Sequence, residues 1–154
     1  MSDRLHRLIY VSRWSNGLGD DLEAGLRRIV MTSMGNNRLV DVTGLLVAHE
    51  GWFLQVLEGP APAVSALVAR IGRDPRHREL KVLASGPEDA RMFQDWNMAG
   101  AKLGLDAEPL LTELGQIARF QGHSLDADAA LKLLTFAGEN ERRRERASLG
   151  LSAA

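Results

Sequence analysis

The sequence predicts an α+β fold of the ferredoxin-like type, in which two helices cover one face of a mixed β-sheet. Two observations lead to this prediction. Short runs of bulky apolar residues, bounded by turn residues, indicate five strands, and two longer segments with apolar residues at helical spacing lie among them. The resulting order is β-α-β-β-α-β-β, and right-handed crossovers place both helices on the same side of the sheet.

The first strand and the first helix are predicted before residue 38. Residues 5–12 alternate loosely around an apolar centre and form the strand. After a polar loop, Asp20 and Glu23 resemble a capping box at the start of a helix. The segment Gly35-Asn36-Asn37 ends that helix, since glycine and asparagine tolerate the left-handed backbone of a helix C-terminus.

A hairpin and a second helix follow. Residues 42–47 and 52–59 are its two strands, joined by the turn His49-Glu50-Gly51. Gly59-Pro60 breaks the second strand, and a helix that ends near Asp74-Pro75 comes next. Its apolar residues follow the spacing i, i+3, i+4, i+7, namely Val64, Leu67, Val68 and Ile71.

Two more strands complete the predicted sheet. Residues 80–83 form the fourth strand. Residues 93–103 are expected to contain the fifth, which carries Trp96 and Met98 on one face. This α+β domain is assigned to residues 1–103.

Residues 104–154 are predicted to form a helical extension. Two stripes of apolar residues indicate two helices, the second starting near Ser124-Leu125-Asp126. The mixed-charge segment 139–146 is expected to be a solvated helix end. Because the second face of the sheet would otherwise expose apolar residues, these helices are expected either to cover it or to form a partner interface.

Composition and charge exclude several classes of function. The net charge of -1 gives no electrostatic case for binding nucleic acid or an anionic membrane. The chain has no cysteine, and its four histidines lack ligand spacing, so neither thiol chemistry nor a metal site is expected. It shows neither a signal-peptide core nor an apolar run of roughly 18 residues, and we expect a cytoplasmic protein.

One amide is unusual among the apolar strand residues. Gln55 lies on the same strand face as Phe53 and Leu57, where an amide costs free energy unless both of its ends are hydrogen-bonded. Backbone groups could satisfy it, or it could form a hydrogen-bond switch beside a bound ring. Tyr10 and Asn37 favour the second interpretation, because the predicted topology brings their elements close to the strand of Gln55.

The second helix ends in a basic cluster that can be interpreted in two ways. Its members are Arg70, Arg73, Arg76, His77 and Arg78. Cations at a helix C-terminus are favoured by the helix dipole and need no further role. Arg70 and Asp74 lie four residues apart, however, which permits either an ion pair or a shared contact with a phosphate or polyol ligand.

Five segments, in this order and spacing, resemble the BLUF family of blue-light sensors that use flavin. They are Leu8-Ile9-Tyr10-Val11-Ser12, Asn36-Asn37 with Val42-Thr43-Gly44-Leu45-Leu46, Phe53-Leu54-Gln55-Val56-Leu57-Glu58-Gly59, Arg70-Ile71 with Asp74-Pro75-Arg76-His77, and Asp95-Trp96-Asn97-Met98. The resemblance covers residues 5 to 103. It implies an oxidised flavin, usually FAD, held between the two helices.

The resemblance also implies a role for individual residues. Tyr10 and Gln55 would be the photoactive pair. Residues Asn36, Asn37, Ile29, Ile71, Arg70 and Asp74 would complete the cofactor site: the asparagines at the polar edge of the ring, the isoleucines beside the ring, and the last two at the ribityl and phosphate portion. Trp96 and Met98 would lie near Gln55 and relay its state.

The function implied by the resemblance is light sensing without enzymatic activity. Light would rearrange the Gln55 amide, and signalling would pass to a downstream protein partner. We also expect a homodimer or a larger homo-oligomer. Two alternatives remain: a non-photoactive regulatory domain that binds another small ligand, and an acylphosphatase-like hydrolase on the same fold. The latter would need a phosphate-binding loop after the first strand, and residues 12–15 form a poor one.

Overall fold

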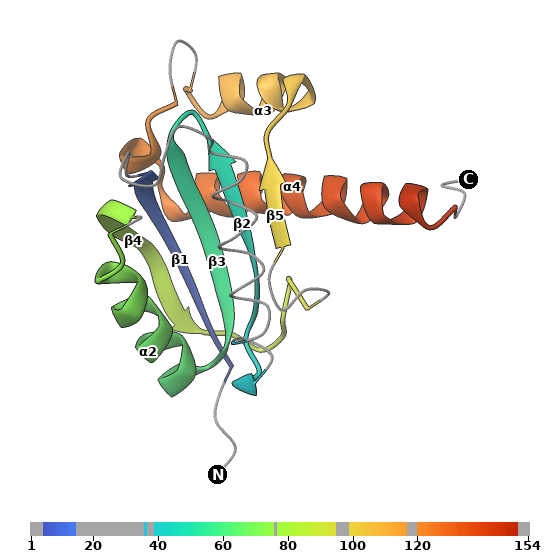
Figure 1. Cartoon of the computed structure of the whole chain (residues 1–154). Coiled ribbons are helices and arrows are strands. Elements are labelled where there is room, and N and C mark those ends of the chain that lie inside the picture. Colours follow the sequence, from blue (N-terminus) through green and yellow to red (C-terminus); the bar gives the residue numbers. More distant parts are fainter. Residues whose placement is uncertain are drawn as a thin grey trace.

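The computed structural model describes residues 5–14, 36, 39–75, 77–94, 99–116 and 120–150. Five strands form one mixed sheet in the order β4-β1-β3-β2-β5 (Figure 1). They are β1 (Leu5–Trp14), β2 (Thr43–His49), β3 (Trp52–Pro60), β4 (His77–Pro87) and β5 (Ala99–Lys102). All neighbouring strands are antiparallel except β2 and β5, which are parallel. The predicted α+β fold with a mixed sheet is therefore confirmed.

The β2–β3 hairpin lies where the sequence predicts it, but its turn is one residue shorter than the predicted His49-Glu50-Gly51. His49 pairs with Trp52, so only Glu50 and Gly51 lie in the loop. Both have positive φ angles, 48° and 80°. A turn of this kind matches the right-handed twist of the flanking strands, and it fixes the register that places Gln55 opposite Leu46.

The described helical segments cover both faces of the sheet. They are α2 (Ala61–Gly72), the 3₁₀ turns η2 (Leu105–Ala107) and η3 (Gly122–Ser124), α3 (Glu108–Glu113) and α4 (Ala127–Ser148). Figure 1 shows α2 on one face, while α4 crosses the opposite face and continues past β5. The predicted helix between Asp20 and Gly35 lies outside the described residues.

Each face has its own apolar core. Toward α2, strand residues such as Leu8, Phe53 and Leu57 pack around the buried Val64 of α2. Toward α4, strand residues of the alternate positions pack against the helix; they include Ile9, Val11, Leu45, Val47, Leu54 and Val56, with Leu133, Leu134 and Ala137 of α4. The C-terminal region thus covers the second face of the sheet. This was one of the two alternatives that the sequence left open.

Several predicted strand boundaries are wrong: β1 ends at residue 14 instead of 12, and β2 covers 43–49 instead of 42–47. β4 runs from residue 77 to 87 instead of 80 to 83, because it is an edge strand with irregular pairing to β1 and many exposed charged residues. β5 covers only 99–102, and Phe93 is buried in the segment before it. Helix α3 ends at Glu113, two residues before Gly115, whose φ of 80° is a backbone conformation that ends a helix.

The start of α4 was predicted correctly. Asp126 is its N-cap, and its carboxylate accepts a hydrogen bond of 2.7 Å from the Ala129 amide. Within the mixed-charge segment 139–146, residue 139 and residues 143–146 are exposed, whereas residues 140–142 are half-buried. Among the described residues, no helix has both the length and the apolarity needed to cross a membrane.

Candidate functional site

Tyr10 and Gln55 are direct neighbours on two central strands. Pairing of β1 with β3 places them opposite each other. The alternation of side chains turns both toward α2, on the same face as Phe53. Tyr10 is fully buried and Gln55 is 3% exposed. The Tyr10 hydroxyl donates a hydrogen bond to Oε1 of Gln55, so the unusual amide has a phenol as one of its partners.

The surroundings of Tyr10 keep its phenol neutral. Burial raises the pKa of Tyr10, and the negative charge of Asp74 raises it further. Asp74 is held in the turn after α2, where its N–H donates to the Ile71 carbonyl at 3.0 Å and its own carbonyl accepts from His77 at 3.0 Å. Tyr10 is therefore a hydrogen-bond donor throughout the physiological pH range.

His77 is a further member of this site, although the sequence placed it in the basic cluster after the second helix and gave it no role beside Tyr10. Its Nδ1 lies 2.8 Å from the hydroxyl oxygen of Ser12. Its ring centroid is 6.0 Å from that of Tyr10 and 5.1 Å from that of Phe53. One feature of the sequence could have pointed to this contact, because the polar Ser12 shares a strand face with Tyr10. The position of His77 itself depends on the pairing of β4 with β1.

A cavity of about 250 Å³ lies along α2, the helix that covers Tyr10 and Gln55. Its apolar wall is formed by Leu39, Val40, Ala63, Ala66 and Leu67. Asn36 and Arg70 supply an amide and a guanidinium group to the same cavity. Two residues of the predicted cofactor set thus line one cavity, although they are far apart in the sequence.

The other predicted site residues divide into two groups. Ile71 is half-buried and packs against the α2-side core, and Asp74 lies close enough to Tyr10 to affect its pKa. Ile29, Asn37, Trp96 and Met98 lie outside the described residues, and their roles remain predictions.

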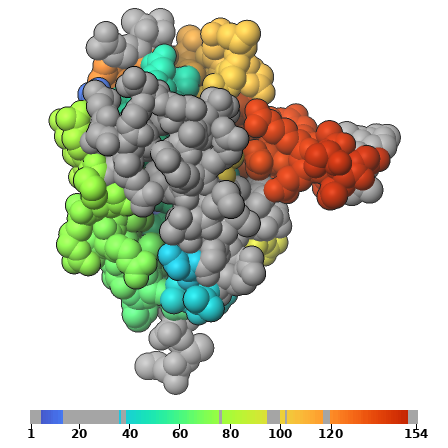
Figure 2. Space-filling view, in the orientation of Figure 1, coloured from blue at the N-terminus to red at the C-terminus, as the bar shows by residue number. Residues whose placement is uncertain are grey.

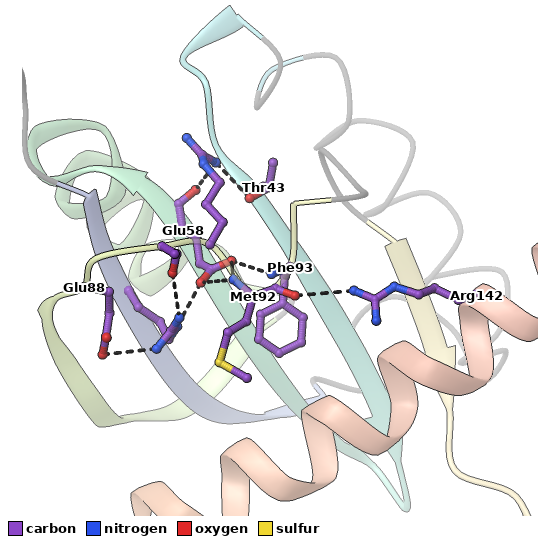
Figure 3. A network of polar contacts seen from close by, with 9 residues as sticks. Thr43, Glu58, Glu88, Met92, Phe93 and Arg142 are labelled. Atoms are coloured by element: carbon purple, nitrogen blue, oxygen red, sulfur yellow. Dashed lines mark hydrogen bonds and ion pairs between the residues drawn. The ribbon is translucent and has the colours of Figure 1, made fainter.

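A second polar cluster surrounds Glu58 on the α4 side of the sheet (Figure 3). Glu58 is fully buried. Its carboxylate accepts hydrogen bonds from the amides of Met92 at 3.0 Å and Phe93 at 2.7 Å, and from Nε of Arg7 at 2.9 Å. Arg142 of α4 donates to the Met92 carbonyl at 3.4 Å. Glu58 therefore fixes the segment before β5 against β3 and, through Met92, connects it to α4.

A larger cavity lies on the α4 side and is separate from the Tyr10–Gln55 pair. It measures about 470 Å³ and includes His49, Glu50, Leu111 and Phe120 in its lining. Burial lowers the pKa of His49, and the nearby Glu50 opposes that shift. Among the described residues, no three His, Asp or Glu side chains could hold a metal ion together.

The residues on the α2 side fit the flavin that the resemblance implies. The cavity combines an apolar wall suited to a flat ring with the cation of Arg70, which suits a phosphate group. Asn36 adds a donor and an acceptor, and the buried Tyr10–Gln55 pair supplies further polar groups on the same face. Among the described residues that line the larger cavity near His49, there is no lysine or arginine.

Comparison of the sequence with curated proteins identifies light-regulated relatives. The chain is 35% identical over 119 residues to the β subunit of the photoactivated adenylate cyclase of Euglena gracilis. It is 33% identical over 118 residues to the α subunit of the cyclase from the same organism. These matches cover 75% of this chain but only 14% and 12% of the two relatives.

The fold of this chain also resembles solved structures of light-responsive proteins. The photo-activated state of BlsA has a TM-score of 0.79 and 27% identity, with 87% of this chain and 94% of that chain covered. The dark-state structure of the BLUF protein BlrB has a TM-score of 0.72 and 28% identity, with coverage of 90% and 99%. The sequence matches the family described as "BLUF: Sensors of blue-light using FAD" over residues 5–99. This chain therefore belongs to the BLUF family of blue-light sensors, whose cofactor is FAD.

Proposed function

We propose that blue light rearranges the hydrogen bonds of Gln55 and that a downstream protein partner responds to this change. As a member of the BLUF family, the chain is a blue-light sensor that uses FAD. The observation that carries the proposal is the buried hydrogen bond from Tyr10 to Gln55, because it joins an oxidisable phenol to an amide that can exchange partners.

Tyr10 is the electron and proton donor in this proposal. Bound flavin supplies a strong oxidant when it absorbs blue light. Tyr10 is the only tyrosine in the chain. Trp52, an alternative donor, belongs to the α4-side core, on the opposite face of the sheet. Loss of an electron makes a phenol strongly acidic, so the Tyr10 proton passes along the existing hydrogen bond to Oε1 of Gln55.

Gln55 retains the change after the electron and a proton have returned to Tyr10, which is then a neutral phenol again. Its amide either rotates, so that nitrogen and oxygen exchange positions, or becomes the imidic tautomer. Both alternatives replace an acceptor by a donor at one position of a nearly fully buried site. With FAD bound, the changed donor pattern of Gln55 would shift the absorption of the flavin to the red.

The signal reaches a partner through a shift in population between two forms of the protein. We assign the first relay to Trp96 and Met98, which precede β5. β5 pairs with β2, the neighbour of the strand that carries Gln55. Self-association as a homodimer or larger homo-oligomer is part of the same proposal.

The test compares three flavin-loaded proteins before and after blue light. The wild type is expected to be yellow and to show a reversible red shift of its flavin absorption band. Gln55→Leu is expected to retain flavin and lose the shift. Gln121→Leu is the matched control, since Gln121 is an exposed glutamine remote in sequence from the site, and it should behave as the wild type.

The outcomes separate this proposal from its alternatives. A colourless protein that cannot be reconstituted with flavin would indicate a regulatory domain for another ligand. An intact red shift in Gln55→Leu would remove Gln55 from the central role. Tyr10→Phe provides a second check, because the variant keeps the ring that packs in the core but cannot donate the proton.

A further inference from the structure

The outer face of α4 has the features of a contact surface. Its inner face is buried against the sheet through residues such as Leu133, Leu134 and Ala137. On the outer side, an open groove of about 480 Å³ runs along the helix and is lined by Leu131 and Phe136, with Met92 and Leu110 beside them. This apolar groove follows a solvent-facing stripe of the helix, where polar residues are the norm.

The C-terminal half of α4 extends beyond the sheet. Figure 1 shows the helix continuing past β5, and Figure 2 shows its end standing out from the body of the molecule. Residues 143–148 are all exposed. A helical end this short is marginally stable in water without packing, so a helix that projects in this way gains from a surface to lie against.

Charged residues occur on the same outer stripe in a self-complementary pattern. Asp128, Lys132, Glu139 and Arg143 are spaced by 4, 7 and 4 residues, which keeps them on one side of the helix. Within the described part of the chain, no ion pair involves Asp128, Lys132 or Glu139. Their charges remain available for a partner.

We propose that the outer face of α4 pairs in antiparallel orientation with the same face of a second copy of this chain. With the twofold axis between Thr135 and Phe136, Lys132 lies opposite Glu139 of the second copy. Asp128 then lies opposite Arg143, and each pair occurs twice. The two grooves then face each other, and residues 143–148 of each projecting end lie opposite residues 123–128 of the other copy.

Other arrangements of the two helices are less favourable. A parallel pair would place Asp128, Lys132 and Glu139 next to their own copies, which brings like charges together. Shifting one helix of the antiparallel pair along the other by one turn brings Asp128 close to Glu139 of the second copy. Moving it in the other direction brings Lys132 close to Arg143. The charge pattern therefore selects one register.

The interface is tested by charge reversal in the full flavin-loaded chain, using sedimentation velocity over a concentration series in the dark. The wild type is expected to dimerise. Lys132→Glu and Glu139→Lys should each weaken dimerisation by roughly tenfold or more, since two ion pairs become two repulsions. A mixture of the two variants should form heterodimers, and the double variant Lys132→Glu/Glu139→Lys should dimerise as the wild type does.

Arg78→Glu is the matched control, because Arg78 is an exposed cation on β4, and this variant should dimerise normally. A wild type that stays monomeric would overturn the proposal and leave the face to a different partner. Dimers that persist in both single variants would also overturn it, as would a double variant that stays monomeric while its flavin spectrum and melting temperature are unchanged.

This inference specifies the surface for the self-association included in the proposed function. The light-induced red shift is recorded on the same samples. A monomeric wild type that keeps the red shift would refute the interface alone. A dimer that lacks the red shift would refute the photochemical proposal alone.

Discussion

Replacement of Glu58 by glutamine should destabilise the protein strongly for so small a change. The Glu58 carboxylate accepts from three donors: the amides of Met92 and Phe93, and Nε of Arg7. A glutamine has one oxygen and one NH₂ group, so at least one of these donors would face another donor. The loss of one hydrogen bond to a charged group costs about 1.5–3 kcal/mol.

The remaining partners of Arg7 limit that cost. Arg7 keeps an ion pair with Glu88 at 3.1 Å and a hydrogen bond to the Ala90 carbonyl at 3.2 Å. The loss of unfolding free energy should therefore be smaller than that caused by breaking a buried ion pair completely, which is about 3–5 kcal/mol. We expect Glu58→Gln to lower the free energy of unfolding by about 2 kcal/mol, which is about 4–8 °C in melting temperature for a chain of this size.

The assay is thermal unfolding of the flavin-loaded protein in the dark, followed by circular dichroism. Glu88→Gln is the matched control, because it removes a carboxylate from the same arginine at a position that is 45% exposed. An exposed ion pair of this kind contributes about 0–1 kcal/mol. Equal melting temperatures for the two variants would refute the argument that the buried network around Glu58 stabilises the fold.

Two further predictions concern protonation and packing. Because the folded-state pKa of Tyr10 is raised, its contribution to stability should be complete below the ordinary value of about 10 and be lost as the pH rises above it. The single tyrosine, labelled with ¹³C at Cζ, should keep the NMR shift of a neutral phenol until the protein unfolds, and a titration near 10 in the folded state would contradict this. Gly44→Ala should destabilise the protein by about 1–3 kcal/mol, since its Cβ would lie 2.2 Å from the Val56 carbonyl oxygen. Gly72→Ala, which meets nothing within 4 Å, should not do so, and equal melting temperatures would refute the packing argument.

The sequence predicts those features of the fold that depend on local pattern. The Glu50-Gly51 turn, the break at Gly59-Pro60 and the N-cap at Asp126 are encoded within a few residues, and the structure has all three. The ends of β4 were not predictable in this way. The many charged residues of β4 do not show the apolar pattern expected of a strand. The length of this edge strand depends on its pairing with β1, a segment more than 60 residues earlier.

The candidate site was predictable in part for the same reason. Gln55 stood out because it interrupts an apolar strand, and the predicted topology and the family resemblance connected Tyr10 with it; period-two alternation indicates the face to which each belongs. His77 gave no such signal, because its contacts with Ser12 and Tyr10 arise from pairing between distant segments. The partners of Glu58 are likewise spread over the chain, in β1 and in the segment before β5.

The alternation along β3 assigns different tasks to its two faces. Gln55 points toward α2 with Phe53 and Leu57, whereas Glu58 belongs to the face of Leu54 and Val56, which packs against α4. The two polar residues are three positions apart, yet the sheet separates their side chains. Glu58→Gln should therefore lower the melting temperature and keep the light-induced red shift, while Gln55→Leu should abolish the red shift whatever its effect on stability. A Glu58→Gln protein that retains flavin but lacks the red shift would show that the two faces of β3 are coupled more tightly than the geometry of the strand requires.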